Sequence, residues 1–204
     1  MKSLNLLAFC TALIGVAPAH AGTLPDPLPQ ALLGAAATAY QETSRRAVTI
    51  DGEAATLVRH ERRDGVHRSL GGEHFSVLVT PKGQLKGFTH MSLALAGRPL
   101  PSRERTEQVA RALLTEVAPD LLPRMRISWI EPHDETIQTD GRAVTLSGMK
   151  MKARNQADGR WFWVIVGADE RPMVFERDIV WITMPGRRQT EKWLHDDWLR
   201  EQSL

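Results

Sequence analysis

The first half of the chain changes from a helical to an alternating pattern of hydrophobic positions. Apolar residues at helical spacing are Leu32, Leu33, Ala36 and Tyr40. They predict a first helix that ends near residues 42–44. The residues that follow have β-type sequence in four stretches, 47–50, 54–59, 75–80 and 84–95. The turn dipeptide Asp51-Gly52 lies between the first two stretches, so we expect an antiparallel hairpin there.

The second half repeats this order. Ser102 is a candidate N-cap, and a helix should run from it until Pro119. Its apolar stripe consists of Val109, Ala110, Leu113, Leu114 and Val117. Strands are then predicted at residues 125–130, 144–153, 160–167 and 173–182. A short closing helix should begin near Thr190 and carry Trp193, Leu194 and Trp198 on one side.

Strands that come in runs, separated by helices, favour an α+β fold with antiparallel sheet over a βαβ fold. We therefore expect one or two helix-plus-antiparallel-sheet units and a short C-terminal helix. The N-terminal α+β half would span residues 22–98 and the C-terminal half residues 99–204. Residues 75–79 (Phe-Ser-Val-Leu-Val) align with residues 162–166 (Phe-Trp-Val-Ile-Val) at an offset of 87, and Phe88 then falls on Phe175. Duplication is one explanation, and chance similarity of apolar strands is the other.

Residues 1–21 have the pattern of a secretory signal peptide. Lys2 precedes an apolar run at residues 6–16, and Ala19-His20-Ala21 offers small residues for cleavage before Gly22. The only cysteine of the chain, Cys10, lies in this segment. We expect a protein that is exported to a bacterial periplasm or secreted, without disulfides or a cysteine nucleophile. No later stretch approaches 18 apolar residues, so no transmembrane segment is expected after cleavage.

Composition and charge narrow the function classes. The chain of 204 residues is 42% hydrophobic and 25% charged, which is typical of a globular protein. Lys and Arg number 26 against 24 Asp and Glu, so the charge gives no sign of a nucleic-acid-binding protein. The sequence contains neither a phosphate-binding Gly-rich loop nor a Gly-x-Ser-x-Gly motif. It assigns no cofactor, and a Ser–His–Asp triad formed by residues distant in sequence stays open.

Two histidines belong to the predicted hairpin formed by residues 75–80 and 84–95: His74 directly precedes the first strand, and His90 lies in the second. If Gly83 forms a bulged turn, His74 and His90 lie directly opposite each other, with Cβ atoms about 5 Å apart. Two imidazoles at this distance could share a metal ion, and Glu73 could add an oxygen ligand. The alternative is a pair of solvated histidines at the base of a hairpin.

The most informative stretch is residues 149–182. A two-residue turn at Asp158-Gly159 would pair residue 154 with 163 and residue 152 with 165, and a four-residue loop would then bring Glu176 opposite Trp163 and Asp178 opposite Trp161. One face of the sheet carries apolar core residues. The other face carries Lys152, Arg154, Trp161, Trp163 and Glu176. Large aromatic residues beside charges form either a recognition surface or a face covered by cation–π contacts and the C-terminal helix.

The helix at residues 102–118, followed by strands that contain residues 163–167 and 174–176, resembles a PepSY-type domain. The resemblance covers residues 100–183 and extends to a degenerate copy at 27–95. It implies a small, cystatin-like exported module that binds a partner and has no catalytic residues to carry over. The family's usual Asp followed by a Thr-Gly turn is absent here, and residues 176–181 (Glu-Arg-Asp-Ile-Val-Trp) stand in its place.

The sequence therefore predicts a periplasmic, non-catalytic binding or accessory protein of the cell envelope. Its partner would be an envelope protein or a small ligand held at the tryptophan-bearing face. One alternative is a metal- or haem-handling protein of an uptake system that uses His74 and His90. A second alternative is a hydrolase whose site no motif marks.

Overall fold

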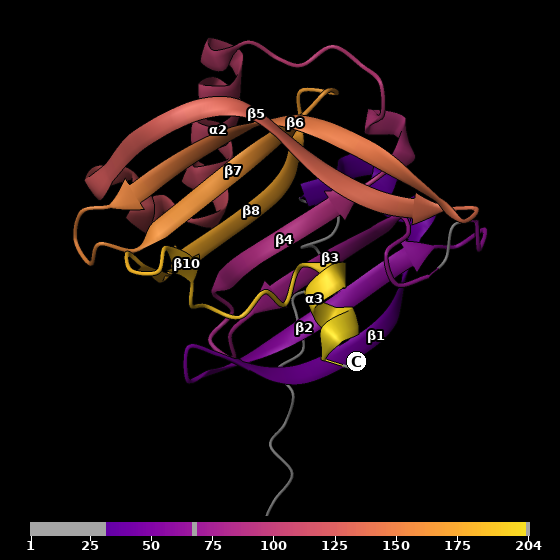
Figure 1. Cartoon of the computed structure of the whole chain (residues 1–204), viewed down its shortest axis with the longest axis horizontal. Coiled ribbons are helices and arrows are strands. Elements are labelled where there is room, and N and C mark those ends of the chain that lie inside the picture. Colours follow the sequence, from indigo (N-terminus) through magenta and orange to yellow (C-terminus); the bar gives the residue numbers. More distant parts are fainter. Residues whose placement is uncertain (1–31, 67–68, 203–204) are drawn as a thin grey trace, which may run out of the picture.

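The computed structural model describes residues 32–66 and 69–202, and its main feature is one eight-stranded antiparallel sheet (Figure 1). The strands are β1 (Tyr40–Ile50), β2 (Glu53–Arg62), β3 (His74–Val79), β4 (Leu85–Met91), β5 (Met125–Thr139), β6 (Arg142–Asn155), β7 (Trp161–Gly167) and β8 (Pro172–Ile179). Their order across the sheet is β1-β2-β3-β4-β8-β7-β6-β5. A separate two-stranded ribbon consists of β9 (Trp181–Ile182) and β10 (Arg187–Arg188).

The sheet is built from two four-stranded meanders that meet at its centre. β3 and β7 begin at His74 and Trp161, and β4 and β8 begin at Leu85 and Pro172, which in both cases is a separation of 87 residues. The meanders join where β4 pairs with β8, and there Phe88 lies directly opposite Phe175. The two halves of the chain thus share one continuous sheet, which the sequence had left open.

Among the described residues, one longer helix, α2, is accompanied by short helical elements. α2 (Arg103–Val117) begins where expected, because the Ser102 hydroxyl accepts a hydrogen bond from the Arg105 amide at 3.1 Å. Near the C-terminus, α3 (Asp196–Glu201) has only six residues. The part of the chain that the structure describes also contains three 3₁₀ turns: η1 (Gly34–Ala39), η2 (Leu93–Leu95) and η3 (Pro119–Arg124). None of the helices in residues 32–66 and 69–202 combines the length and the apolar character that a membrane crossing needs.

The prediction of helix-plus-antiparallel-sheet units is wrong, because the sheet dominates the fold and only α2 is a helix of substantial length among the described residues. The first predicted helix stops at Ala39, and Tyr40 begins an 11-residue strand. The hairpin at Asp51-Gly52 pairs β1 with β2 as far as Tyr40 and Arg62, so long-range pairing overrides the helical spacing. The predicted signal peptide, residues 1–21, lies outside the described residues.

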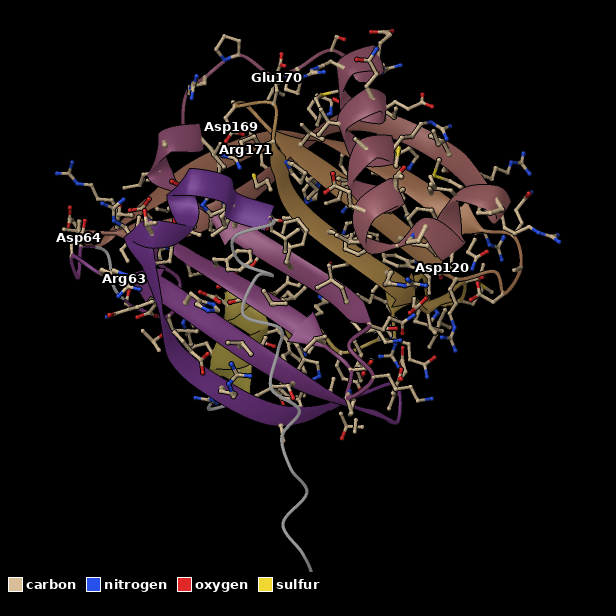
Figure 2. All side chains as sticks on the ribbon, turned by 180° about the vertical axis from the view of Figure 1, so that it is seen from behind. Arg63, Asp64, Asp120, Asp169, Glu170 and Arg171 are labelled. Carbon is tan, nitrogen blue, oxygen red and sulfur yellow. The ribbon has the colours of Figure 1, made fainter. Side chains whose placement is uncertain are left out.

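The two faces of the sheet have different covers. On one face, α2 packs across the β5–β8 half, as seen from behind in Figure 2. Arg171, labelled there, donates a hydrogen bond to the Leu33 carbonyl at 2.8 Å and so ties the β7–β8 loop to the N-terminal part of the described chain. On the opposite face lies the C-terminal segment, residues 189–202, whose α3 is yellow in Figure 1. Leu194 and Leu199 of this segment pack against the β1–β4 half.

Gly87 is where the C-terminal segment comes closest to the sheet. A Cβ atom at this position would lie 2.8 Å from Cδ1 of Leu194 and 2.4 Å from the carbonyl oxygen of Phe175. Only glycine leaves room there for both the neighbouring strand and the covering leucine. The lack of a side chain at Gly87 therefore allows the C-terminal segment to lie this close to β4.

Candidate functional site

The predicted tryptophan-bearing face exists, with a register that differs from the expected one by two residues. Arg154 lies opposite Trp161 and Lys152 opposite Trp163. The difference arises because a four-residue turn, residues 156–159, closes this hairpin, with Asn155 N–H donating to the Arg160 carbonyl at 2.9 Å. A shift of two residues keeps each side chain on the same face of the sheet. The face assignment from sequence is therefore confirmed although the pairing was wrong.

Glu176 lies opposite Trp163, as expected. Asp178 was expected opposite Trp161, but Ile179 takes that place. The reason is a bulge at Asp178, whose φ of 61° is in the left-handed region. Asp178 is turned instead toward Lys86, whose Nζ lies 2.9 Å from its carboxylate.

Two of the five predicted surface residues are buried. Trp163 is only 5% exposed, and Glu176 is buried beside it. The Arg188 guanidinium of β10 covers both side chains: it forms a two-pronged ion pair with Glu176, at 2.6 and 3.0 Å, and lies 5.5 Å from the ring centroid of Trp163. For these two residues the covered alternative holds, because the β9–β10 ribbon closes over this part of the sheet.

The buried carboxylate of Glu176 is held in its charged form. Burial by itself would raise its pKa, but the charges of Arg188 and His195 lower it, and the net pKa lies well below the ordinary glutamate value. His195 Nε2 is 3.2 Å from the second carboxylate oxygen. Glu176 thus joins the sheet to β10 and to the C-terminal segment.

The other three predicted residues stay at the surface and lie beside two tryptophans that sequence reasoning missed. The ammonium group of Lys152 is within 6 Å of three ring centroids: 4.6 Å from Trp161, 4.9 Å from Trp181 and 5.6 Å from Trp129. We call these four residues the Lys152 cluster. Arg154 is exposed next to it, 5.5 Å from the Trp161 ring.

Trp129 and Trp181 were missed for identifiable reasons. A bulge between Ile127 and Trp129 sets the face on which Trp129 lies, and β-type sequence alone does not reveal a bulge. Trp181 belongs to a ribbon of two-residue strands, shorter than any sequence pattern can identify. The signal that could have found them was the number of tryptophans itself, six in a chain with 6% aromatic residues.

Lys152 has no acidic partner among the described residues. Its charge rests on the faces of the three indole rings, and burial lowers its pKa. Beside the cluster, Arg126 of β5 lies directly opposite Arg154 of β6. The Lys152 cluster therefore combines aromatic surface with positive charge that no carboxylate neutralises.

The predicted metal pair is not formed. A bulge near Leu78 and Val79 shifts the β3–β4 register, so that His74 lies opposite Met91 and His90 opposite Phe75. The two imidazoles consequently occupy opposite faces of the sheet. His90 Nε2 is 3.1 Å from the hydroxyl of Tyr40, on the face covered by α2. Within the part of the chain that the structure describes, no three acidic, histidine or cysteine side chains form a group suited to a metal ion.

His74 faces the C-terminal segment and lines a cleft of about 400 Å³ beside α3. Its Nε2 is 3.3 Å from the Thr89 hydroxyl, and its Nδ1 is 2.8 Å from the Gly72 carbonyl and 3.5 Å from the Asp196 carboxylate. A hydroxyl, an imidazole and a carboxylate in this order are reminiscent of a hydrolase triad.

Other contacts of His74 and Asp196 indicate that these residues attach α3 to the sheet. The Asp196 carboxylate accepts hydrogen bonds from two nitrogens of Arg59, at 2.7 and 3.0 Å, and from the Gly71 amide at 2.6 Å. Nδ1 of His74 donates to the Gly72 carbonyl, and the Gly71 amide, a natural oxyanion donor, is already engaged by Asp196. The His74 network therefore fastens α3 to the sheet.

Comparison with protein-family models, with curated proteins and with solved structures gave no match to this chain. The resemblance to PepSY-type domains accordingly stays a prediction.

Proposed function

We propose that this protein is an exported, non-catalytic binding protein of the cell envelope and that it holds its partner at the Lys152 cluster. One observation carries the proposal: the Lys152 ammonium is held by three tryptophan rings and has no acidic partner among the described residues. A cation in this setting keeps N–H donors available for an anionic group of a partner. The tryptophan rings beside it offer apolar contact area.

The strand framework supports this proposal. Trp129, Lys152 and Trp161 stand on three neighbouring strands, β5, β6 and β7, which are paired on both sides of the bulge before Trp129, so the backbone holds these three side chains in place before any partner arrives. Arg154 and Arg126 extend the positive charge along the same face. This charge favours a partner that carries carboxylate or phosphate groups.

Site-specific photocrosslinking tests the proposal. The photoreactive residue p-benzoylphenylalanine replaces Thr183, an exposed residue two positions beyond Trp181, and the protein is irradiated in intact cells. The control carries the same group in place of Lys82, which is exposed in the β3–β4 turn. We expect covalent adducts from position 183 alone, and we expect the substitution Lys152→Met to reduce their yield several-fold. Equal adducts from both positions, or a yield insensitive to Lys152→Met, would contradict the proposal.

Export is tested separately. Mature protein released from the periplasm or recovered from the medium should begin at Gly22, as measured by intact mass and N-terminal sequencing. If the protein is cytoplasmic and retains Met1, the proposed location in the cell envelope is wrong. The proposed binding surface is unaffected by that result.

A further inference from the structure

The β9–β10 ribbon and its turn, residues 181–188, expose an apolar tip. In residues 32–66 and 69–202, three large hydrophobic side chains are exposed: Val66, Trp181 and Met184. Two of the three belong to this ribbon, where Trp181 is 42% and Met184 is 86% exposed. Exposed apolar side chains that gather on one projecting element mark an interaction site more often than isolated ones do.

Positive charge lies at the base of this ribbon. Residues 181–188 contain two arginines and no acidic residue. Arg187 is exposed, and the Lys152 ammonium lies 4.9 Å from the Trp181 ring. The ribbon therefore presents Met184 and Trp181 to solvent with cations at its base.

The base of the ribbon is held to the sheet. Its second arginine, Arg188, turns inward and pairs with the buried Glu176, and it also donates hydrogen bonds to the carbonyls of Thr190 and Glu191 at 2.9 and 3.0 Å. Arg187 pairs with Ile182 and Arg188 with Trp181 across the two strands. Because the base of the ribbon is fixed to the sheet, the turn that carries the exposed Met184 is anchored close to the Lys152 cluster.

We propose that this ribbon docks on the surface of a lipid bilayer that contains anionic phospholipid. The inference rests on the proposed function, because Trp181 and Lys152 belong to the Lys152 cluster. Indole rings favour the boundary between lipid headgroups and acyl chains, and a methionine at the tip enters the apolar side of that boundary. Lys152 and Arg187 then lie at the level of the phosphate groups, where an anionic surface attracts them. A bilayer fits the combination of apolar tip and cationic base, because it offers an apolar layer to Met184 and phosphate groups to Lys152 and Arg187.

Vesicle co-sedimentation tests this inference with the full mature chain. The wild type should sediment with vesicles of phosphatidylethanolamine and phosphatidylglycerol, and much less with vesicles of phosphatidylcholine alone. Met184→Ser should lower the partition coefficient about tenfold. Arg187→Gln should lower it on the anionic vesicles, by an amount that shrinks as salt is added. Tryptophan fluorescence should shift to shorter wavelength on binding and lose that shift in Trp181→Gln.

A matched control separates a specific site from general stickiness. Val66 is 47% exposed in a loop remote in sequence from the ribbon, so Val66→Ser removes exposed apolar surface away from the ribbon and should leave vesicle binding unchanged. Circular dichroism should show that each of these surface variants is folded. Failure of the wild type to sediment, or equal losses in Val66→Ser and Met184→Ser, overturns the lipid inference.

The same experiments distinguish the two proposals. Adducts to a protein from position 183, without vesicle binding, would keep the proposed binding function and reject the bilayer as its partner. A second outcome is vesicle binding that depends on Met184 but not on Lys152, together with crosslinks that are insensitive to Lys152→Met. This outcome would reject the Lys152 cluster as the binding site. It would also reject the placement of Lys152 at the phosphate groups of the bilayer.

Discussion

A largely buried ion pair with two hydrogen bonds joins Arg59 of β2 to Asp196 at the start of α3. The two residues are 137 positions apart in sequence. Arg59 also donates to the carboxylate of Glu61 at 3.0 Å and to the carbonyl of Ser69 at 3.1 Å. Its nitrogens are therefore all engaged, and the pair fixes the C-terminal segment on the face of the sheet opposite α2. The candidate surface depends on this arrangement, because the same segment supplies His195 to Glu176.

Asp196→Ala should detach α3 from the sheet. The substitution removes the carboxylate that pairs with the buried Arg59 guanidinium. Because a buried charge without this partner is unfavourable, the free energy of unfolding should fall by about 3 kcal/mol. Urea denaturation followed by circular dichroism measures the loss. Asp197→Ala is the matched control, since the Asp197 side chain is 91% exposed on the same helical turn, and it should cost at most about 0.5 kcal/mol. Equal losses in the two variants would show that Arg59 does not carry the attachment.

Because of Glu176, the free energy of unfolding should decrease as the pH falls into the acid range. Its pKa in the folded state lies below the ordinary value of 4.5, so its contribution to stability is complete above that value and is lost as the pH falls below it. Glu176→Gln should be less stable at neutral pH, because Arg188 then has no carboxylate, and its stability should vary less below pH 4.5. Unfolding by urea at a series of pH values checks both effects. Parallel profiles for the wild type and the variant would contradict the assigned role of Glu176.

His90 should act in a different pH range. Burial, with smaller effects from His74 and Arg171, lowers its pKa from 6.5 to about 4. The unfolded state therefore binds a proton first as the pH falls, and stability should decrease between pH 6.5 and about 4, by about 3 kcal/mol in total. Titration of the imidazole signals by NMR should give this low value. In His90→Gln the decrease over this range should be smaller, and an imidazole that titrates near 6.5 in the folded protein would rule the explanation out.

Short-range patterns in the sequence predicted two elements correctly. Asp51-Gly52 gave the β1–β2 hairpin, in which Ile50 pairs with Glu53. Ser102 and Pro119 bracketed α2. These features depend on residues close together in the chain, where turn geometry and helix capping act directly.

Features that depend on long-range pairing could not be read in the same way. The β4–β8 junction joins the two meanders into one sheet, and no local pattern distinguishes it from two separate sheets. Bulges near Leu78 and at Asp178 moved His90 and Asp178 away from their expected neighbours. Burial of Glu176 depends on Arg188, which reaches it from a two-residue strand. Each of these is decided by how distant segments pack, and single-residue shifts in register change which face a side chain occupies.

Trp163 and Trp161 should respond very differently to truncation, although the sequence presents them as equivalent. Trp163 is buried between Lys150, 4.4 Å from its ring, and the Arg188 guanidinium, so Trp163→Ala leaves a large cavity and should cost about 3–5 kcal/mol. Trp161 is half-buried at the edge of the Lys152 cluster, and Trp161→Ala should cost about 1 kcal/mol while it removes most of the crosslinking at position 183. Urea denaturation and the photocrosslinking yield, measured on both variants, separate a core residue from a binding residue. If Trp161→Ala unfolds the protein as readily as Trp163→Ala does, the ring of Trp161 belongs to the core and the Lys152 cluster loses its role as a surface.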